Sequence, residues 1–231
     1  MERTSVLRFG AICAFLVAAL QVLAGVTHFL LPSDQLRGAT GVDAAFFLSL
    51  AESSAVFTVH YWIVALGCLF NLGVTVALFT LLRGHRSGFF CWAALLGGVG
   101  LALGAADYAL VGVESPRIAQ RFAAAPTAAQ AALLLQGVPH VDPCFFGWGL
   151  MGLGWLTANV AALRADRLPR LLASLGILGG LLTLSGFAGA LIRSTLVVDI
   201  AVGLGFLVVA PVWSFWFGWT LHRGVARETV A

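Results

Sequence analysis

His28, His60 and Asp107 combine a group capable of acid–base chemistry with a position inside an apolar run. A carboxylate inside a bilayer costs about 2.5–3.5 kcal/mol on insertion scales, so Asp107 is expected to face protein or water. A desolvated Asp107 could act as a general acid or base, with His60 or His28 as its proton partner. We therefore take these three residues as candidate catalytic residues for acid–base chemistry on a small lipophilic substrate.

Amide and aromatic side chains on the same apolar runs could form the walls of a pocket around these groups. We expect the substrate pocket to contain Gln21, Asn71, Tyr108, Trp148 and Trp155. Aromatic walls beside an acid would also suit a carbocation reaction, because a cation is attracted to the face of an aromatic ring. The polar residues fall mainly in the outer third of their runs, which predicts a pocket near the outer leaflet.

The same residues leave other functions open. His28 and His60 lie at one depth on adjacent antiparallel runs, as the two axial ligands of a b-type haem must, so haem b is an alternative cofactor. A transporter or a lipid-binding accessory protein, with Asp107 as a proton or cation site, is a further alternative. Neither His28 nor His60 belongs to an HxxxH or HxD pair, and we predict no metal site. Whether the protein is an enzyme stays undecided.

The composition is that of a chain surrounded by lipid. Of its 231 residues 60% are hydrophobic and only 10% are charged, with a mean hydropathy of +0.98, whereas soluble domains average about 25% charged residues. Membrane lipids are therefore expected partners. The net charge of +3 gives no reason to expect a nucleic-acid partner. The oligomeric state cannot be read from these features.

Six apolar runs meet the requirement of roughly 20 residues for a membrane-spanning helix. They cover residues 9–31, 55–82, 89–113, 144–164, 171–192 and 195–221. We predict an all-helical, polytopic membrane bundle with six transmembrane helices, forming one domain over residues 1–231.

A face of small residues in the third run should bring helices close together. Gly97, Gly100, Gly104 and Asp107 are spaced so that they share one side of a helix. Small residues in this arrangement allow two helix backbones to approach closely. The carboxyl group of Asp107 should then lie at the end of a tightly packed seam.

The distribution of arginines predicts the orientation of the bundle. Nine arginines lie in the N-terminal segment, the tail and the loops at 83–88 and 164–170, whereas four lie in the remaining loops. By the positive-inside rule, both termini are expected in the cytoplasm. Two longer loops, 32–54 and 114–143, are then extracytoplasmic, and the first should hold a short interfacial helix that begins after Asp43.

The last run contains features of its own. Pro211 is expected to kink the helix, because it lacks a backbone N–H and its ring clashes with the preceding turn. Trp213, Trp216 and Trp219 follow it and are typical of an aromatic belt at the inner membrane interface.

Two short stretches resemble a known family. Residues 167–180, Arg-Leu-Pro-Arg-Leu-Leu-Ala-Ser-Leu-Gly-Ile-Leu-Gly-Gly, precede a glycine-rich run, and Arg-Phe-Gly-Ala-Ile begins the first run at Arg8. Both are similar to stretches in a family of bacterial integral membrane proteins of unknown function. The resemblance implies six or seven helices and a multi-pass protein of the bacterial inner membrane. It implies no catalytic residues.

Overall fold

The spanning helices of the computed structural model lie close to the predicted segments. The structure describes residues 3–36, 43–82, 88–136 and 145–228, and no strand occurs among them. Six helical stretches are long and apolar enough to cross a membrane: Thr4–Leu30, Ala55–Leu81, Gly88–Ala124, Phe146–Arg164, Arg170–Leu191 and Thr195–Gly224. The prediction of an all-helical fold with six candidate spans is confirmed, which indicates a multi-pass membrane protein.

The spanning helices form a closed ring in chain order. The first five are α1 (Arg3–Leu30), α4 (Ala55–Leu81), α5 (Gly88–Ala124), α7 (Phe145–Arg164) and α8 (Arg170–Leu191). The sixth is built from α9 (Thr195–Ile200), η2 (Ala201–Val209) and α10 (Ala210–Glu228). Each helix packs on the next, α8 packs on η2, and α10 returns to α1. The ring therefore encloses an interior that all six spans can line.

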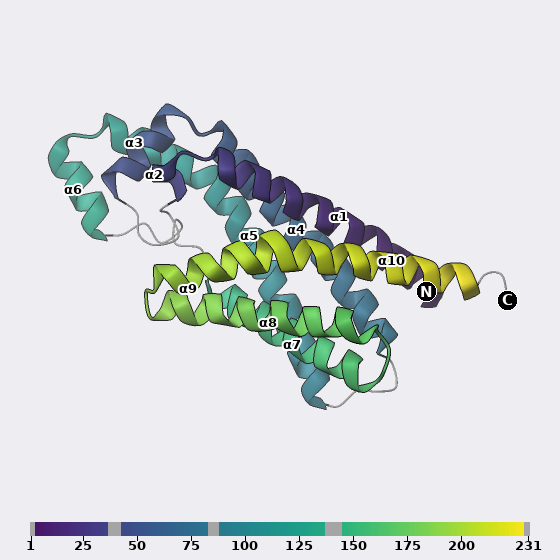
Figure 1. Cartoon of the computed structure of the whole chain (residues 1–231). Coiled ribbons are helices and arrows are strands. Elements are labelled where there is room, and N and C mark those ends of the chain that lie inside the picture. The colour runs from purple at the N-terminus through teal and green to yellow at the C-terminus, as the bar shows by residue number, and fades with distance from the viewer. Residues whose placement is uncertain (1–2, 37–42, 83–87, 137–144, 229–231) are drawn as a thin grey trace.

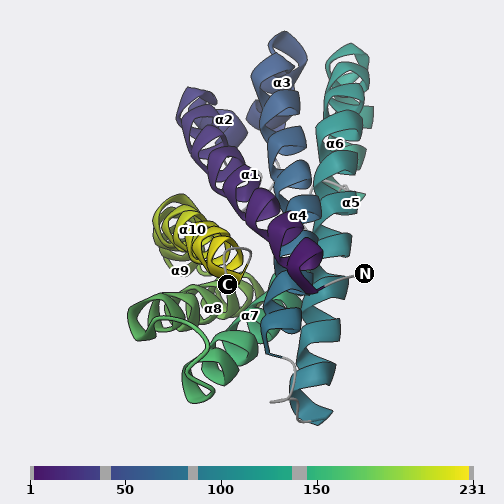
Figure 2. The ribbon, with the colours of Figure 1, turned by 90° about the vertical axis from the view of Figure 1, so that its right-hand side faces the viewer.

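The two ends of the ring differ (Figure 1). Three short helices, α2 (Ser33–Leu36), α3 (Ala44–Glu52) and α6 (Thr127–Gln136), gather at one end, here called the capped end. At the opposite end, here called the terminal end, α1 begins and α10 finishes. Figure 2 shows α4 and α5 lengthwise and α10 nearly end-on, so the helices cross steeply rather than running parallel.

Glycines bring α5 and α7 into direct backbone contact. A Cβ atom on Gly100 would lie 2.7 Å from the carbonyl oxygen of Gly147, and one on Gly97 would lie 3.0 Å from the Cα of Gly154. The predicted seam is confirmed at these two positions. Gly104 differs, because its nearest neighbour would be the Sγ of Cys68 at 3.5 Å, an ordinary contact.

The helix α5 is longer than predicted. The sequence placed its end near residue 113, whereas the structure continues it through Pro116 to Ala124. Proline cannot donate to the carbonyl four residues earlier, which here belongs to Gly112. The Oγ1 of Thr58 on α4 donates to that carbonyl instead, at 3.2 Å. A hydrogen bond from a neighbouring helix thus replaces the one that the proline removes.

The helix α3 packs against the extended part of α5. Asp43 is its N-cap, as predicted, and accepts a hydrogen bond from the backbone N–H of Phe46 at 2.9 Å. Phe46 and Phe47 are fully buried, and Phe47 stacks on Phe122 of α5 with ring centroids 4.8 Å apart. The predicted short helix after Asp43 is confirmed, and its apolar side packs against protein.

A large apolar cluster, here called the terminal core, closes the terminal end of the ring. Its fully buried members include Leu82, Leu172 and Phe217. Trp213 belongs to it, with 2% of its surface exposed, and its Nε1 donates to the Oδ1 of Asn159 at 3.2 Å. The prediction of Trp213 as a membrane-belt residue was wrong, because its side chain points into the bundle and bonds to another helix.

The sixth span contains a nine-residue π-helical stretch, η2, directly before Pro211. At its end the backbone N–H of Ala210 donates to the carbonyl of Gly205, five residues earlier. In regular α-helical register Pro211 would face the carbonyl of Leu207 without an N–H to offer it. The wider register is one way of accommodating this proline, and π-helical stretches are frequent at functional sites.

Candidate functional site

The interior of the ring contains a cavity of about 180 Å³ near the capped end. This volume is far larger than the about 10–15 Å³ that one water molecule requires. Its walls come from α1, α2, α4, α5, α7 and η2. Interior spaces between helices are common places for small-molecule sites in bundles.

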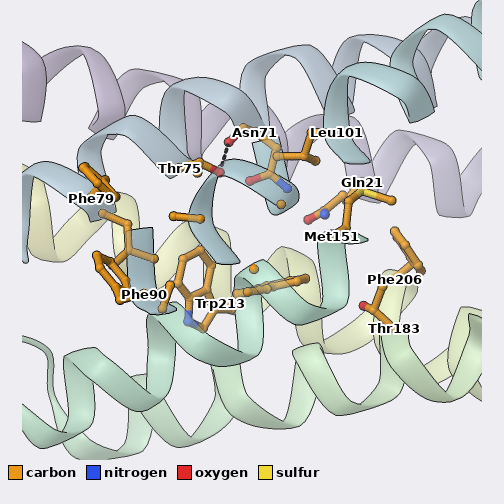
Figure 3. Close-up of a pocket in the computed structure, with 16 residues that line it drawn as sticks. Gln21, Asn71, Thr75, Phe79, Phe90, Leu101, Met151, Thr183, Phe206 and Trp213 are labelled. Carbon is orange, nitrogen blue, oxygen red and sulfur yellow. Dashed lines mark hydrogen bonds between the residues drawn. The ribbon is translucent and has the colours of Figure 1, made fainter. Parts of the chain in front are cut away.

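A smaller cavity of about 60 Å³ adjoins the first on the side of the terminal end. The two share five lining residues: Gln21, Asn71, Leu101, Met151 and Phe206. Figure 3 shows Gln21 and Asn71, from α1 and α4, with both amide groups directed into the space inside the ring. The smaller cavity ends on Leu78, Ala158 and Trp213, which belong to the terminal core. The combined space is therefore blind at the terminal end.

His28 and His60 lie together on the wall of the larger cavity. Their ring centroids are 5.9 Å apart, with the ring planes tilted by 45°. The Nδ1 of His60 is 2.8 Å from the Oγ1 of Thr27, which also lies 2.9 Å from the carbonyl oxygen of Leu23. The contact with Thr27 joins His60 of α4 to α1 beside the cavity.

The histidine pair does not fit the haem alternative. A porphyrin with two axial histidines must lie between their rings. Here the rings come from α1 and α4, and the two helices touch beside the pair, where the Nδ1 of His60 lies 2.8 Å from the Oγ1 of Thr27. A porphyrin could separate His28 and His60 only if these helices moved apart. We derive no chemistry through haem.

The candidate acid lies apart from the histidines. Asp107 is partly buried on α5 and lines neither cavity, whereas its neighbour Tyr108 lines the larger one. The Oδ2 of Asp107 is buried and has no hydrogen-bond partner among the described residues. No group of three or more histidine, cysteine, aspartate or glutamate side chains in the described part of the chain could hold a metal ion. The structure thus brings the two histidines together and leaves Asp107 outside their cavity.

All five residues expected in the substrate pocket lie on cavity walls. Tyr108 and Trp148 line the larger cavity, Trp155 lines the smaller one, and Gln21 and Asn71 line both. The Nε1 of Trp148 donates to the Oη of Tyr108 at 2.7 Å, joining α7 to α5. This bond holds two large side chains in fixed positions on the wall.

Sequence reasoning missed Gln35, a cavity-lining residue of α2 that is only 2% exposed. Its Nε2 donates to the carbonyl oxygens of Ser49 and Ser53, at 3.2 and 2.8 Å. Because carbonyls only accept, these bonds fix which end of the amide is nitrogen. The Oε1 is buried without a partner among the described residues. A polar residue in the short polar stretch after Pro32 carries no periodic signal that could have identified it.

Comparison with known proteins gives a family and nothing further. Residues 12–224 match the family model described as Domain of unknown function (DUF4386). The chain belongs to this family. The match covers five of the six candidate spans completely and the first from Ile12 onward. It includes residues 167–180, one of the two stretches that carried the resemblance, and the family is one of unknown function, as the resemblance implied. No curated protein and no solved structure matches the chain.

Proposed function

We propose that this protein binds a small lipophilic molecule in the cavity inside its helix ring. The observation that carries the proposal is the cavity itself, about 180 Å³ in volume and walled by five of the six spans. Polar groups occupy a few positions on walls that are otherwise apolar and aromatic, which is the usual make-up of small-molecule sites. Catalysis is not part of the proposal, because Asp107 does not line the cavity.

The blind form of the space favours binding over conduction. A channel needs a continuous path between the two ends of the bundle. In this conformation the smaller cavity stops at the terminal core, where Trp213 and Phe217 stack with centroids 4.8 Å apart. A binding pocket needs only one way in.

Filling the cavity tests the proposal. Gly67 lines the larger cavity, and a Cβ atom there would meet nothing within 4 Å. Gly67→Leu should therefore fill the space without a steric clash. Gly203 also has open space around it but lines neither cavity, so Gly203→Leu is the matched control.

The readout is native mass spectrometry of the protein released from detergent. We expect wild type and Gly203→Leu to retain one small lipophilic molecule per chain and Gly67→Leu to lose it. Equal retention by all three proteins, or no retained molecule in wild type, would overturn the proposal.

We also propose that the protein is a multi-pass protein of the bacterial inner membrane with both termini in the cytoplasm. The arginine distribution supports this orientation, since nine of thirteen arginines lie in the N-terminal segment, the tail and the loops at 83–88 and 164–170. The larger cavity would then lie toward the extracytoplasmic side.

A further inference from the structure

Hydrogen-bonding groups mark both ends of the larger cavity, and each end has one buried amide oxygen without a partner among the described residues. At the capped end are Gln35, His28 and His60, here called the histidine end. At the junction with the smaller cavity are Gln21 and Asn71, here called the amide end. We infer that the bound lipophile carries a hydrogen-bonding group at each end of an apolar body. This inference rests on the proposed function and specifies the class of ligand.

The histidine end presents a buried hydrogen-bond acceptor. The Oε1 of Gln35 is buried and unpartnered in the described part of the chain, and hydrogen bonds from Nε2 to backbone carbonyls fix its orientation. A buried acceptor without a partner costs about 1–3 kcal/mol of desolvation, so this end favours a ligand group that donates, such as a hydroxyl or an amine.

The amide end offers both kinds of group. The Oε1 of Gln21 is buried, and no described residue donates to it. The side chain of Asn71 makes no hydrogen bond to the described residues, although its backbone carbonyl accepts one from the Oγ1 of Thr75 at 2.9 Å (Figure 3). An amide supplies a carbonyl acceptor and two N–H donors. A ligand hydroxyl here could accept from one amide and donate to the other.

The distance between the ends sets the length of the ligand. Seven residues separate Gln21 from His28 on α1, about 10 Å at 1.5 Å per residue. Eleven residues separate His60 from Asn71 on α4, about 16 Å by the same rise. The wall between the ends is mainly apolar, with Leu20, Val64 and Leu207 on three different spans. The ligand class is thus a medium-length lipophile with polar termini about 10–16 Å apart.

A pair of probes tests this class. Dodecanediol, with a hydroxyl at each end of its chain, and dodecanol, with one, have the same apolar body. We expect wild type in lipid nanodiscs to bind the diol about tenfold more tightly, which corresponds to ~1.4 kcal/mol. Affinities come from the rise in melting temperature with probe concentration.

A substitution at the amide end tests whether the second hydroxyl of dodecanediol binds there. Gln21→Leu keeps the size of the side chain and removes the amide, so it should abolish the preference for the diol over dodecanol. Gln120→Leu, at an exposed position of α5, should preserve the preference. Asn71→Leu gives an independent second test of the same end.

The outcomes separate this inference from the proposed function. Equal binding of the two probes by wild type, blocked by Gly67→Leu, would overturn the ligand class and leave the pocket standing. A diol preference that survives both Gln21→Leu and Asn71→Leu would likewise overturn it. Failure of both probes to bind wild type, together with no retained molecule, would overturn both proposals.

Discussion

Asp107 is the residue whose position in the structure agrees least with the role predicted for it. It was predicted as the acid of a shared pocket, and it sits on the face that carries Gly97 and Gly100. Helical spacing identified that face correctly, because a period of 3.6 residues follows from backbone geometry alone. Spacing along one helix does not reveal which neighbouring helix borders the cavity. The cavity lies on the side of Tyr108, the adjacent residue.

We therefore expect Asp107→Asn to leave retention of the bound molecule unchanged. The substitution removes a charge whose Oδ2 is buried without a partner among the described residues, so the free energy of unfolding should rise by ~1 kcal/mol. Thermal unfolding in detergent and native mass spectrometry measure the two effects. Glu114→Gln on the same helix is the control, since Glu114 pairs with Arg117 at the surface. Loss of the retained molecule in Asp107→Asn would restore the acid–base interpretation.

Pocket residues on regular helices could be anticipated from the sequence, whereas others could not. Gln21 and Asn71 stand out as amides within apolar runs, and both line the cavities. Phe206 was missed because it lies in η2, where the π-helical register shifts each side chain relative to an α-helical pattern. Trp213 was misassigned because residue type alone does not distinguish a tryptophan at the membrane interface from one in the protein core.

At the scale of elements, the proline in α5 shows why helix ends are hard to predict. Pro116 within a polar stretch is a reasonable signal for the end of a helix. Here the hydrogen bond from Thr58 to the carbonyl of Gly112 and the packing of α3 on Phe122 stabilise a continuous helix. Both are contacts between distant parts of the chain, which a local sequence pattern does not contain.

The replacement of the hydrogen bond lost at Pro116 by the one from Thr58 can be measured as a coupling between two substitutions. Thr58→Val removes the donor to Gly112 and should lower the free energy of unfolding by ~1 kcal/mol. In a Pro116→Ala background, the restored backbone N–H can serve the same carbonyl, so the cost of Thr58→Val should fall. Thermal unfolding of the single and double variants gives the coupling.

The control for this pair of substitutions is Thr80→Val, on α4 like Thr58. The hydroxyl of Thr80 donates to the carbonyl of Val76 at 2.9 Å. Thr80→Val should show no coupling to Pro116→Ala. Equal costs of Thr58→Val in both backgrounds would mean that the cross-helix hydrogen bond does not replace the one lost to proline.

At the scale of the whole molecule, composition and run length were sufficient to predict the number of spans. Each of the six runs is bounded by charged or turn-forming residues, and the helices of the structure follow them within a few residues except at the C-terminal end of α5 and the N-terminal end of α1. The steep crossing of the helices and the cavity that it accompanies were not predictable in this way. They depend on which side chains meet between spans, such as Trp148 with Tyr108.

The orientation of the bundle is a prediction at this scale. Reporter fusions after Gln130 should report the extracytoplasmic side and fusions after Arg167 the cytoplasm, because the arginine-rich segments should stay inside. These positions lie at opposite ends of the ring, in α6 and in the turn between α7 and α8. Fusion of the reporter to the C-terminus, also expected in the cytoplasm, is the control. A cytoplasmic signal from the fusion after Gln130 would contradict the six-span orientation.

Closure of the cavity at the terminal end affects how long a bound molecule stays as well as how tightly it binds. Because the terminal core closes one end, a held molecule can leave only past the short helices of the capped end or through a seam between two spans. Collective helix motions of this kind take microseconds to seconds. The residence time would then follow how often the ring opens, and a substitution that tightens a seam far from the ligand would prolong occupancy without touching the ligand.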